Sequence, residues 1–288
     1  MRLATCRRLT LTALLVLPLL PAPSRAEEPQ RIVSIGGSVT EIVYALGEED
    51  RLVARDTTST YPPEVAALPD IGYIRQLSPE GVLSVNPTLV LTEEGAGPPE
   101  AVELLKEASI EFVEIPEGYD RAAVLTKIRR VSEVLGVPEK GEQLASDVAA
   151  ALDDAGRIVG EESSGTPPRR VLFVLSMQGG RVMAGGANTA ADGIIRLAGG
   201  VNAVAGFDGY KPLSDEAIIE AAPDVILMMA RGGDLAVSDE ALFSHPAIAS
   251  TPAGETRAVL RIDGMKLLGF GPRTAEAATE LAHALAGG

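Results

Sequence analysis

The sequence predicts an α/β protein in which a single long α-helix joins two Rossmann-like lobes, with a ligand cleft between them. Three observations indicate this fold class. Strand-like apolar runs alternate with helical segments in both halves, one long helical pattern separates the halves, and a short motif occurs twice. Because parallel neighbours need a crossover connection, the alternation indicates βαβ units and parallel pairing. A cleft between two lobes is a preferred place for a small ligand.

The first half is predicted to start with a buried strand and a capped helix. Residues 31–35 are a short apolar run, and Ser38 and Glu41 match a capping box that opens a helix ending at Leu46. Further strands are expected at residues 52–55, 89–91 and 112–115, with a helix at residues 99–108.

A long helical pattern over residues 139–159 follows, with Leu144, Val148, Ala151 and Leu152 on one face. A polar break rich in Pro and Gly then precedes a second half that repeats the layout of the first. Its expected strands are residues 171–175, 225–229 and 259–262, and its expected helices are residues 190–197 and 274–285. The predicted division is a leader at 1–26, a first lobe at 27–138, a bridging helix at 139–162 and a second lobe at 163–288.

A local repeat relates the two halves. Ser78 and Glu80 correspond to Ser214 and Glu216, and both pairs are 136 residues apart. In each copy a Ser caps a short helix, a Glu lies in its first turn, and a Pro ends the helix before a buried strand. Any capped helix–strand unit has this appearance, but the shared spacing favours duplication.

Composition excludes several classes of protein. The 288 residues hold 25 Lys and Arg against 40 Asp and Glu, a net charge of −15, so no surplus of cations is present to neutralise nucleic-acid phosphates. Hydrophobic residues make up 46% of the chain, which argues against a disordered polymer and for one or two domains.

The first residues have the layout of a secretory signal peptide. A basic start with Arg2, Arg7 and Arg8 precedes an apolar run over residues 9–20 and a small-residue ending at Ala26. That run is shorter than the ~20 residues that span a bilayer, so cleavage after Ala26 is favoured over an uncleaved membrane helix. Cleavage would remove four Arg and the single Cys, which changes the net charge to −19.

Enzyme motifs are scarce. The two histidines, His245 and His283, do not pair with a nucleophile motif, no Gly-x-Ser-x-Gly elbow occurs, and no paired His spacing indicates zinc. An exported hydrolase would need an activated nucleophile or a metal centre.

The chain has five tyrosines, of which Tyr73 is chemically the most informative. It lies two residues before Arg75, and a nearby cation favours the phenolate form, which is a known axial ligand of heme iron. From the residues alone, an ordinary packing or surface role explains Tyr73 better than a role as iron ligand.

Several segments resemble periplasmic hemin-binding proteins of bacterial heme ABC importers. The similar segments are residues 31–41, 58–64, 68–81 and 269–273, and the Gly72-Tyr73-Ile74-Arg75 motif is the most specific of them. The resemblance implies a periplasmic, monomeric receptor whose lobes are bridged by one rigid helix. Such a receptor captures heme in its cleft and delivers it to a permease dimer at the inner membrane.

The resemblance also implies the site. Tyr73 would be the axial ligand of the heme iron, and Arg75 would bond the phenolate or a propionate. Further heme contacts are expected from Arg231, Met177, Lys211 and Tyr61. Each of these residues also has an interpretation without a role in heme binding. Arg231 can be a solvated loop residue, Met177 an apolar packing residue and Tyr61 a turn residue. No His occurs between residues 171 and 186, where some relatives place one near heme, so the number of hemes and the sixth ligand stay open.

In related importers one Glu on each lobe docks onto basic residues of the permease, and Glu80 and Glu216 match those positions. The alternative is that both acids stabilise a helix dipole, by ~0.3–1 kcal/mol. A corrinoid or ferric-siderophore receptor of the same fold is the main rival reading. The Gly-Tyr-x-Arg motif and the absence of Trp favour heme.

Overall fold

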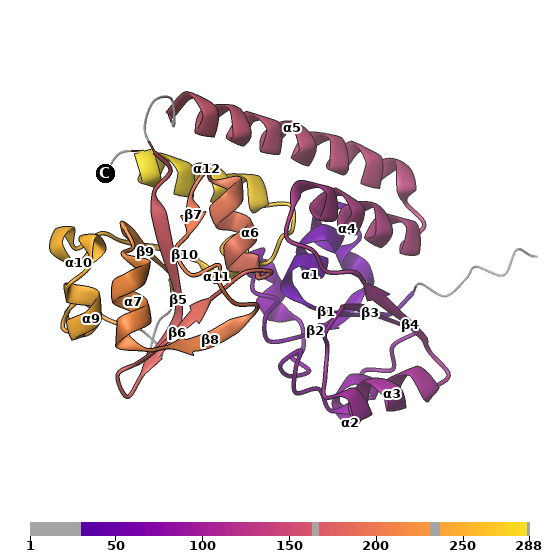
Figure 1. Cartoon of the computed structure of the whole chain (residues 1–288). Helices are drawn as coiled ribbons and strands as arrows, with labels where there is room; N and C mark the ends of the chain where they lie inside the picture. The colour runs from indigo at the N-terminus through magenta and orange to yellow at the C-terminus, as the bar shows by residue number, and fades with distance from the viewer. Residues whose placement is uncertain (1–29, 163–166, 231–236, 287–288) are drawn as a thin grey trace, which may run out of the picture.

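The computed structural model describes residues 30–162, 167–230 and 237–286 (Figure 1). The predicted leader and the candidate residue Arg231 lie outside these ranges. Within the described residues, no helix combines the length and the apolar character needed to cross a membrane.

The first half is built on a parallel four-stranded sheet in the order β2-β1-β3-β4. Its strands are β1 (Ile32–Ile35), β2 (Leu52–Arg55), β3 (Leu89–Glu93) and β4 (Glu111–Ile115). The helical segments of this half are α1 (Gly37–Ala45), η1 (Glu49–Arg51), η2 (Pro63–Ala67), α2 (Pro79–Leu83), α3 (Pro99–Glu107) and α4 (Arg121–Val134). Helices α1 and α4 pack on one face of the sheet, and α2 and α3 pack on the other, so the predicted βαβ units are confirmed.

The expected capping box at the start of α1 is wrong. The helix begins at Gly37, so Ser38 lies inside it, and no side chain caps its N-terminus. The Ser38 hydroxyl instead donates to Glu93 on β3, and Glu41 pairs with Arg273 from the second half. Tertiary partners therefore outcompete the local capping pattern.

One long helix, α5 (Pro138–Glu162), runs along the top of the molecule and packs on α4 of the first half and α12 of the second. Its buried face includes Val148 and Leu152 as predicted, but Ala151 is exposed and Ala155 is buried instead. Burial at 145, 148, 152 and 155 follows the three-and-four spacing of a helix, which leaves position 151 outside the stripe.

The second half contains a mixed sheet in the order β10-β9-β5-β6-β8, with β7 paired to β5. Its strands are β5 (Arg170–Gln178), β6 (Arg181–Gly185), β7 (Val201–Asn202), β8 (Tyr210–Leu213), β9 (Val225–Ala230) and β10 (Val259–Asp263). Strands β6 and β8 run antiparallel to their neighbours, so the expectation that this half repeats the layout of the first is only partly correct. These two strands were missed because β6 and β8 do not form the continuous apolar runs that mark buried parallel strands.

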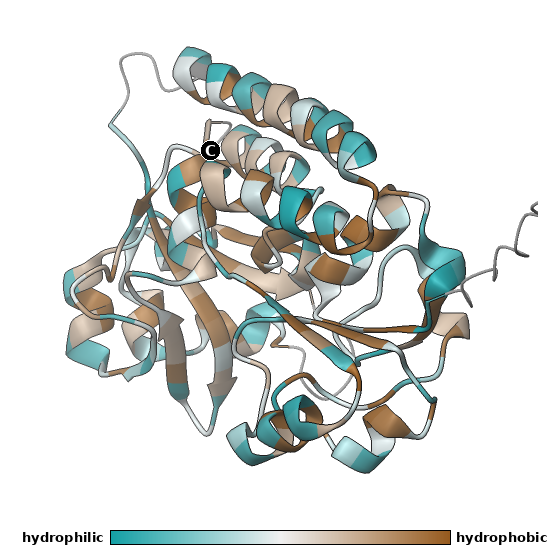
Figure 2. Ribbon diagram, turned by 90° about the vertical axis from the view of Figure 1, so that its right-hand side faces the viewer, coloured by the Kyte–Doolittle hydropathy of each residue, from teal (hydrophilic) through white to brown (hydrophobic). Residues whose placement is uncertain are grey.

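Helices cover both faces of this second sheet. Their bounds are α6 (Ala190–Leu197), α7 (Asp215–Ala221), α8 (Asp239–Phe243), α9 (Pro246–Ala249), α10 (Pro252–Thr256), α11 (Gly264–Leu268) and α12 (Thr274–Ala286). Helices α6, α11 and α12 share one apolar cluster with α1, α4 and α5, so a single core runs through both halves. Helices α7 to α10 pack on the opposite face in a separate cluster. Figure 2 shows apolar strands at the centre and polar residues along the outer helices.

Candidate ligand-binding cleft

The segment that contains Tyr73 crosses the carboxyl ends of the strands of the first sheet. The Ile71 amide donates to the carbonyl of Arg55 at the end of β2 (3.0 Å), and the Gly97 amide, beyond β3, donates to the Ile74 carbonyl (2.9 Å). Ile71 and Ile74 are buried beneath the segment, whereas 42% of Tyr73 is exposed. Ligands of open α/β sheets bind at this edge.

Two further tyrosines face the same space as Arg75. Tyr119, from the connection between β4 and α4, packs edge-to-face on Phe270 with ring centroids 5.4 Å apart. Tyr210 on β8 packs on Phe173 with centroids 6.3 Å apart. The charge of Arg75 acts on both hydroxyls and lowers the pKa of each, so this first-half cation lies near Tyr210 of the second half.

Burial outweighs that effect at both tyrosines. It raises the pKa of Tyr119 to about 12, with the carboxylate of Glu117 adding to the rise. Burial also raises the pKa of Tyr210, although its hydrogen bonds to Ala191 and Thr189 oppose the shift. Both hydroxyls therefore hold their protons more firmly than a free phenol.

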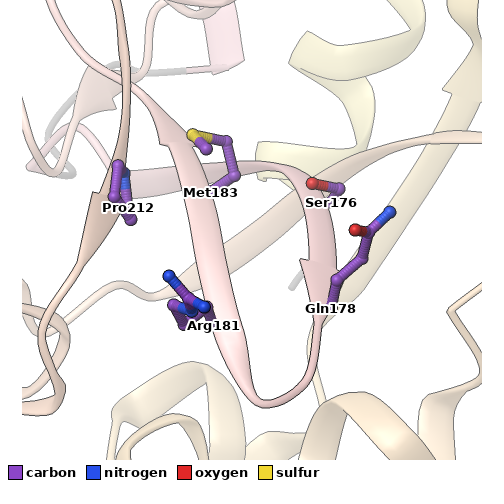
Figure 3. Close-up of a pocket in the computed structure, with 5 residues that line it drawn as sticks. All are labelled: Ser176, Gln178, Arg181, Met183 and Pro212. Carbon is purple, nitrogen blue, oxygen red and sulfur yellow. The ribbon is translucent and has the colours of Figure 1, made fainter.

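The second-half wall of the cleft is one face of the β5–β6–β8 ribbon. A pocket of about 310 Å³ on this face is lined by Ser176, Gln178, Arg181, Met183 and Pro212 (Figure 3). Strand pairing places these residues opposite one another, and Tyr210 lies two positions before Pro212 on the same face. The pocket therefore combines apolar surface with one guanidinium and two polar side chains. No ion pair of Arg181 occurs among the described residues.

Met177 and Lys211 occupy the opposite face of this ribbon. Met177 pairs with Val182 and packs on the cluster beneath α7 and α9. The Lys211 ammonium lies over the ring of Phe207, 5.4 Å from its centroid. The structure thus does not bring these two candidates to the face of Tyr210, because successive strand residues point to opposite sides.

Tyr61 lies at the junction of the two halves. The guanidinium carbon of Arg273 is 3.9 Å from its ring centroid. Arg273 in turn donates to both carboxylate oxygens of Glu41, through Nε at 3.0 Å and through Nη2. Burial raises the pKa of Glu41, and the pairing with Arg273 opposes that shift.

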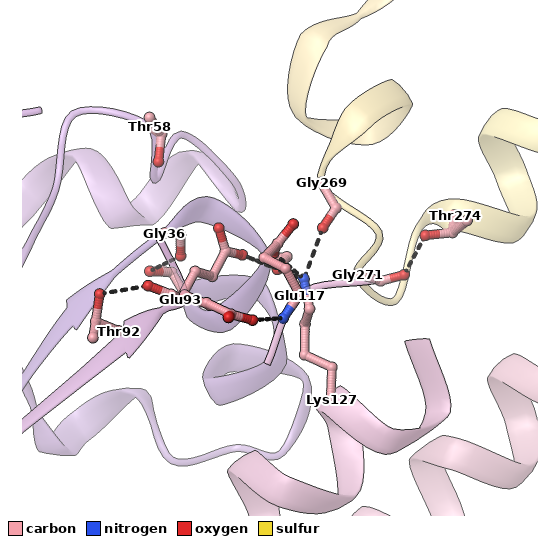
Figure 4. A network of polar contacts seen from close by, with 12 residues as sticks. Gly36, Thr58, Thr92, Glu93, Glu117, Lys127, Gly269, Gly271 and Thr274 are labelled. Atoms are coloured by element: carbon pink, nitrogen blue, oxygen red, sulfur yellow. Dashed lines mark hydrogen bonds and ion pairs between the residues drawn. The ribbon is translucent and has the colours of Figure 1, made fainter. Parts of the chain in front are cut away.

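A buried cation lies behind the cleft (Figure 4). The Lys127 ammonium on α4 donates to Ser38 (2.9 Å), to Glu117 (2.9 Å) and to the Gly269 carbonyl of the second half (3.2 Å), and it lies 3.6 Å from Glu93. Burial raises the pKa of Glu93, against the opposing effect of Lys127. This network joins α1, β3 and α4 to the second half.

The two repeated glutamates lie outside the cleft, in the first turns of α2 and α7. Hydrogen bonds from the residue's own backbone N–H and from the preceding Ser lower the pKa of Glu80, and the same pair of contacts lowers the pKa of Glu216. Both acids are exposed and stay ionised to lower pH than a free glutamate.

Sequence reasoning missed Arg181, Ser176, Gln178 and Tyr119 as cleft residues. One pattern could have revealed the first three, because Gly179-Gly180 between two short strand-like runs is typical of a tight hairpin. Both glycines have positive φ, as such a turn requires. Tyr119 has no comparable local pattern.

Two α/β halves with one shared core, and with aromatic and cationic side chains facing each other between them, define a two-lobed ligand-binding protein. A family model described as periplasmic binding protein matches residues 32–265, so the chain belongs to that family. The fold class predicted from the sequence is confirmed.

Solved structures of periplasmic heme-binding proteins match nearly the whole chain, which confirms the family recognised from the sequence. BhuT, in complex with two hemes, is 41% identical with a TM-score of 0.85, and the match covers 90% of this chain and 98% of BhuT. RhuT from Roseiflexus sp. RS-1, in apo form, has the same identity and TM-score, with coverage of 90% and 99%. A periplasmic heme-binding protein from Pseudomonas aeruginosa is 33% identical with a TM-score of 0.82, covering 90% and 93%.

Curated relatives are more distant. The ABC transporter substrate-binding lipoprotein YvrC of Bacillus subtilis (strain 168) is 27% identical over 264 residues, which is 90% of this chain and 81% of that protein. The vitamin B12-binding protein of Vibrio cholerae serotype O1 is 26% identical over 226 residues, which is 78% and 77% of the two chains.

Proposed function

We propose that this protein is a periplasmic receptor that binds ferric heme through Tyr73 and delivers it to an ABC-type permease. The observation that carries the proposal is the position of the Tyr73–Arg75 segment at the carboxyl edge of the first sheet, with Arg75 near enough to Tyr210 of the second half for its charge to act on that hydroxyl. The 41% identity to heme-binding proteins over 90% of the chain supports the same ligand. In this reading heme is the transported ligand, and the protein is not an enzyme.

Among the cleft tyrosines, Tyr73 suits the role of iron ligand best. An iron-bound tyrosine must give up its proton, and burial makes that harder at Tyr119 and Tyr210. Tyr61 is stacked against Arg273. Tyr73 is 42% exposed at the carboxyl edge of the first sheet and lies two residues before Arg75 in the sequence.

The propionates of heme need cations, since the mature chain would be strongly acidic. Arg75 on the first half and Arg181 on the second half would bind one carboxylate each, and Gln178 and Ser176 would add hydrogen bonds beside Arg181. Met183 and Pro212 supply apolar surface for the macrocycle. Arg231, the second-half cation expected from the sequence, lies outside the described residues. Lys211 faces away from this wall.

Export and delivery complete the proposal. The mature protein would start after Ala26 and act as a monomer, with lobes at 27–138 and 163–288 bridged by the helical segment 139–162. Glu80 and Glu216, one on each half, would dock onto basic residues of the permease. A corrinoid receptor remains the competing reading, since a vitamin B12-binding protein is related at 26% identity.

Hemin titration of the purified mature protein, followed by absorbance, tests the ligand and its coordination. We expect a saturable Soret shift with the high-spin ferric spectrum of a tyrosinate ligand, lost in Tyr73→Phe and retained in the control Tyr44→Phe on α1. A wild-type-like spectrum in Tyr73→Phe would contradict the ligand assignment, and loss of the spectrum in Tyr210→Phe would move it to β8. Binding of cyanocobalamin but not hemin would establish the corrinoid reading.

A further inference from the structure

The two copies of the repeated motif have the same local structure. Ser78 caps α2 by accepting the Gly81 amide, and Ser214 caps α7 by accepting the Ala217 amide, each at 3.2 Å. Strands β3 and β9 begin at positions 136 residues apart, as the two caps do. The repeat is therefore a repeat of structure as well as of sequence.

Each copy buries one aliphatic side chain and exposes the next. Val82 and Ile218 are 0% and 1% exposed and anchor the two helices to their sheets. The following residues, Leu83 and Ile219, are 37% and 50% exposed. Since the anchor already attaches each helix, neither exposed aliphatic has a role in the core of its own half.

Both exposed aliphatics lie on the face of the repeated acids. Leu83 follows Glu80 by three residues, and Ile219 follows Glu216 by three, a spacing that makes helix residues neighbours on one surface. Exposed large aliphatics are scarce in the described part of the chain, where the two others are Leu104 and Val201. Two of the four thus occupy equivalent positions beside the two acids.

We propose that each docking site is composite, with an acid and an aliphatic side chain three residues apart: Glu80 with Leu83, and Glu216 with Ile219. The fitting partner is a two-fold symmetric membrane protein that presents, in each half, a basic side chain next to apolar surface. Two copies of one pattern on a single chain match two copies of one surface on a symmetric partner. This inference rests on the proposed delivery of heme to a permease.

The acid and the aliphatic side chain of each site are expected to affect different rate constants. Opposite charges steer encounter and are screened by salt, so the acids govern the association rate. Burial of apolar surface is not screened and mainly governs how long the complex lasts. In Figure 1, α2 and α7 belong to different halves and both lie away from α5. The exposure of both acids and both aliphatic side chains leaves these sites open to a partner.

The test measures association of the full mature protein with its reconstituted permease complex in lipid nanodiscs, by biolayer interferometry at two salt concentrations. In the double variant Leu83→Ser with Ile219→Ser, we expect a dissociation rate about tenfold faster, an unchanged association rate, and a loss that persists at high salt. Glu80→Gln with Glu216→Gln should instead slow association and flatten its salt dependence. The control Leu104→Ser with Val201→Ser removes exposed aliphatics elsewhere and should match the wild type.

The outcomes separate the inference from the function on which it rests. If the Leu83 and Ile219 variant dissociates like the control while the acid variant binds poorly, the composite site is wrong and acid docking stands. If the wild type does not bind the permease complex at all, delivery itself is wrong. Hemin titration of each variant should match the wild type, because these helices lie outside the cleft. A loss of hemin binding in these variants would show that the docking sites and the ligand-binding cleft are not separate surfaces.

Discussion

The guanidinium of Arg273 lies over the ring of Tyr61, with Cζ 3.9 Å from the centroid, although the two residues are 212 positions apart. The same guanidinium forms a two-pronged ion pair with Glu41 on α1, and the carboxylate of Asp263 is 3.5 Å from it. One cation thus connects the second half to the core helix and to the cleft rim of the first half. The position of Tyr61 depends on a charge contributed from the far end of the chain.

Arg273→Met is expected to destabilise the protein strongly, because it leaves the carboxylate of Glu41 buried without a cation. Removing one partner of a buried pair typically costs about 3–5 kcal/mol. Urea unfolding followed by circular dichroism measures the loss, a suitable method since the chain has no Trp. Arg273→Lys keeps the positive charge but loses the planar guanidinium that contacts both carboxylate oxygens, so its stability should fall between those of the wild type and Arg273→Met. Equal stability of the Met variant and the wild type would contradict this role.

Arg181→Gln is expected to weaken hemin binding roughly tenfold, or about 1.4 kcal/mol, by removing a propionate partner. It should also reduce the preference for hemin over its dimethyl ester, whose carboxylates are blocked. The measurement is a pair of titrations, one with each porphyrin. Arg169→Gln removes the same charge just before β5, at the end of that strand remote from the pocket residue Gln178, and should behave like the wild type. An undiminished preference in Arg181→Gln would assign the propionates to other cations.

Glu93→Gln is expected to alter how stability depends on pH. Burial raises the folded-state pKa of Glu93 above its ordinary value of 4.5, so the folded state holds this proton more tightly than the unfolded chain. The resulting stability is present below about pH 4.5 and is lost as the pH rises through the folded-state pKa. The free energy of unfolding of the wild type, minus that of Glu93→Gln, should therefore decrease from pH 4 to pH 7. A difference that stays constant or increases would show that the pKa of Glu93 is not raised in the folded state.

Ala222→Asn is expected to stabilise the protein by about 0.5–1 kcal/mol, since Ala222 has a left-handed backbone (φ 39°) that Asn tolerates better. The structural repeat supplies the reciprocal experiment, because Asn86 stands 136 residues earlier with φ 49°. Asn86→Ala should lose a similar amount. Urea unfolding of both variants checks the pair, and changes of the same sign would refute the argument.

Local patterns predicted much of the fold. The apolar runs at 171–175 and 225–229 predicted buried parallel strands, because a strand that is covered on both faces has apolar residues at successive positions. Ser78 and Ser214 predicted the starts of α2 and α7, because an N-cap contacts only the first turn of its helix. The antiparallel strands β6 and β8 were not predicted, since Arg181, Lys211 and Pro212 interrupt the continuous apolar run that marks a buried strand.

The candidate site divides in the same way. Tyr73 and Arg75 could be proposed from the sequence because the Gly-Tyr-x-Arg motif, which resembles that of hemin-binding proteins, lies within four consecutive residues. Whether Met177 or Ser176 faces the cleft is a matter of strand register, which a bulge between Val174 and Ser176 alters. No local pattern contains that information.

The sequence by itself determined the α/β alternation, the bridging helix, the duplicated motif and the Tyr-x-Arg segment, all of which arise from interactions within a few residues. Only the tertiary structure decided which side chains meet across the two halves. Lys127 reaches the Gly269 carbonyl, Arg273 reaches Glu41 and Tyr61, and the charge of Arg75 acts on the Tyr210 hydroxyl. These partners lie more than a hundred residues apart, and buried charges and strand register select them once the sheets have packed.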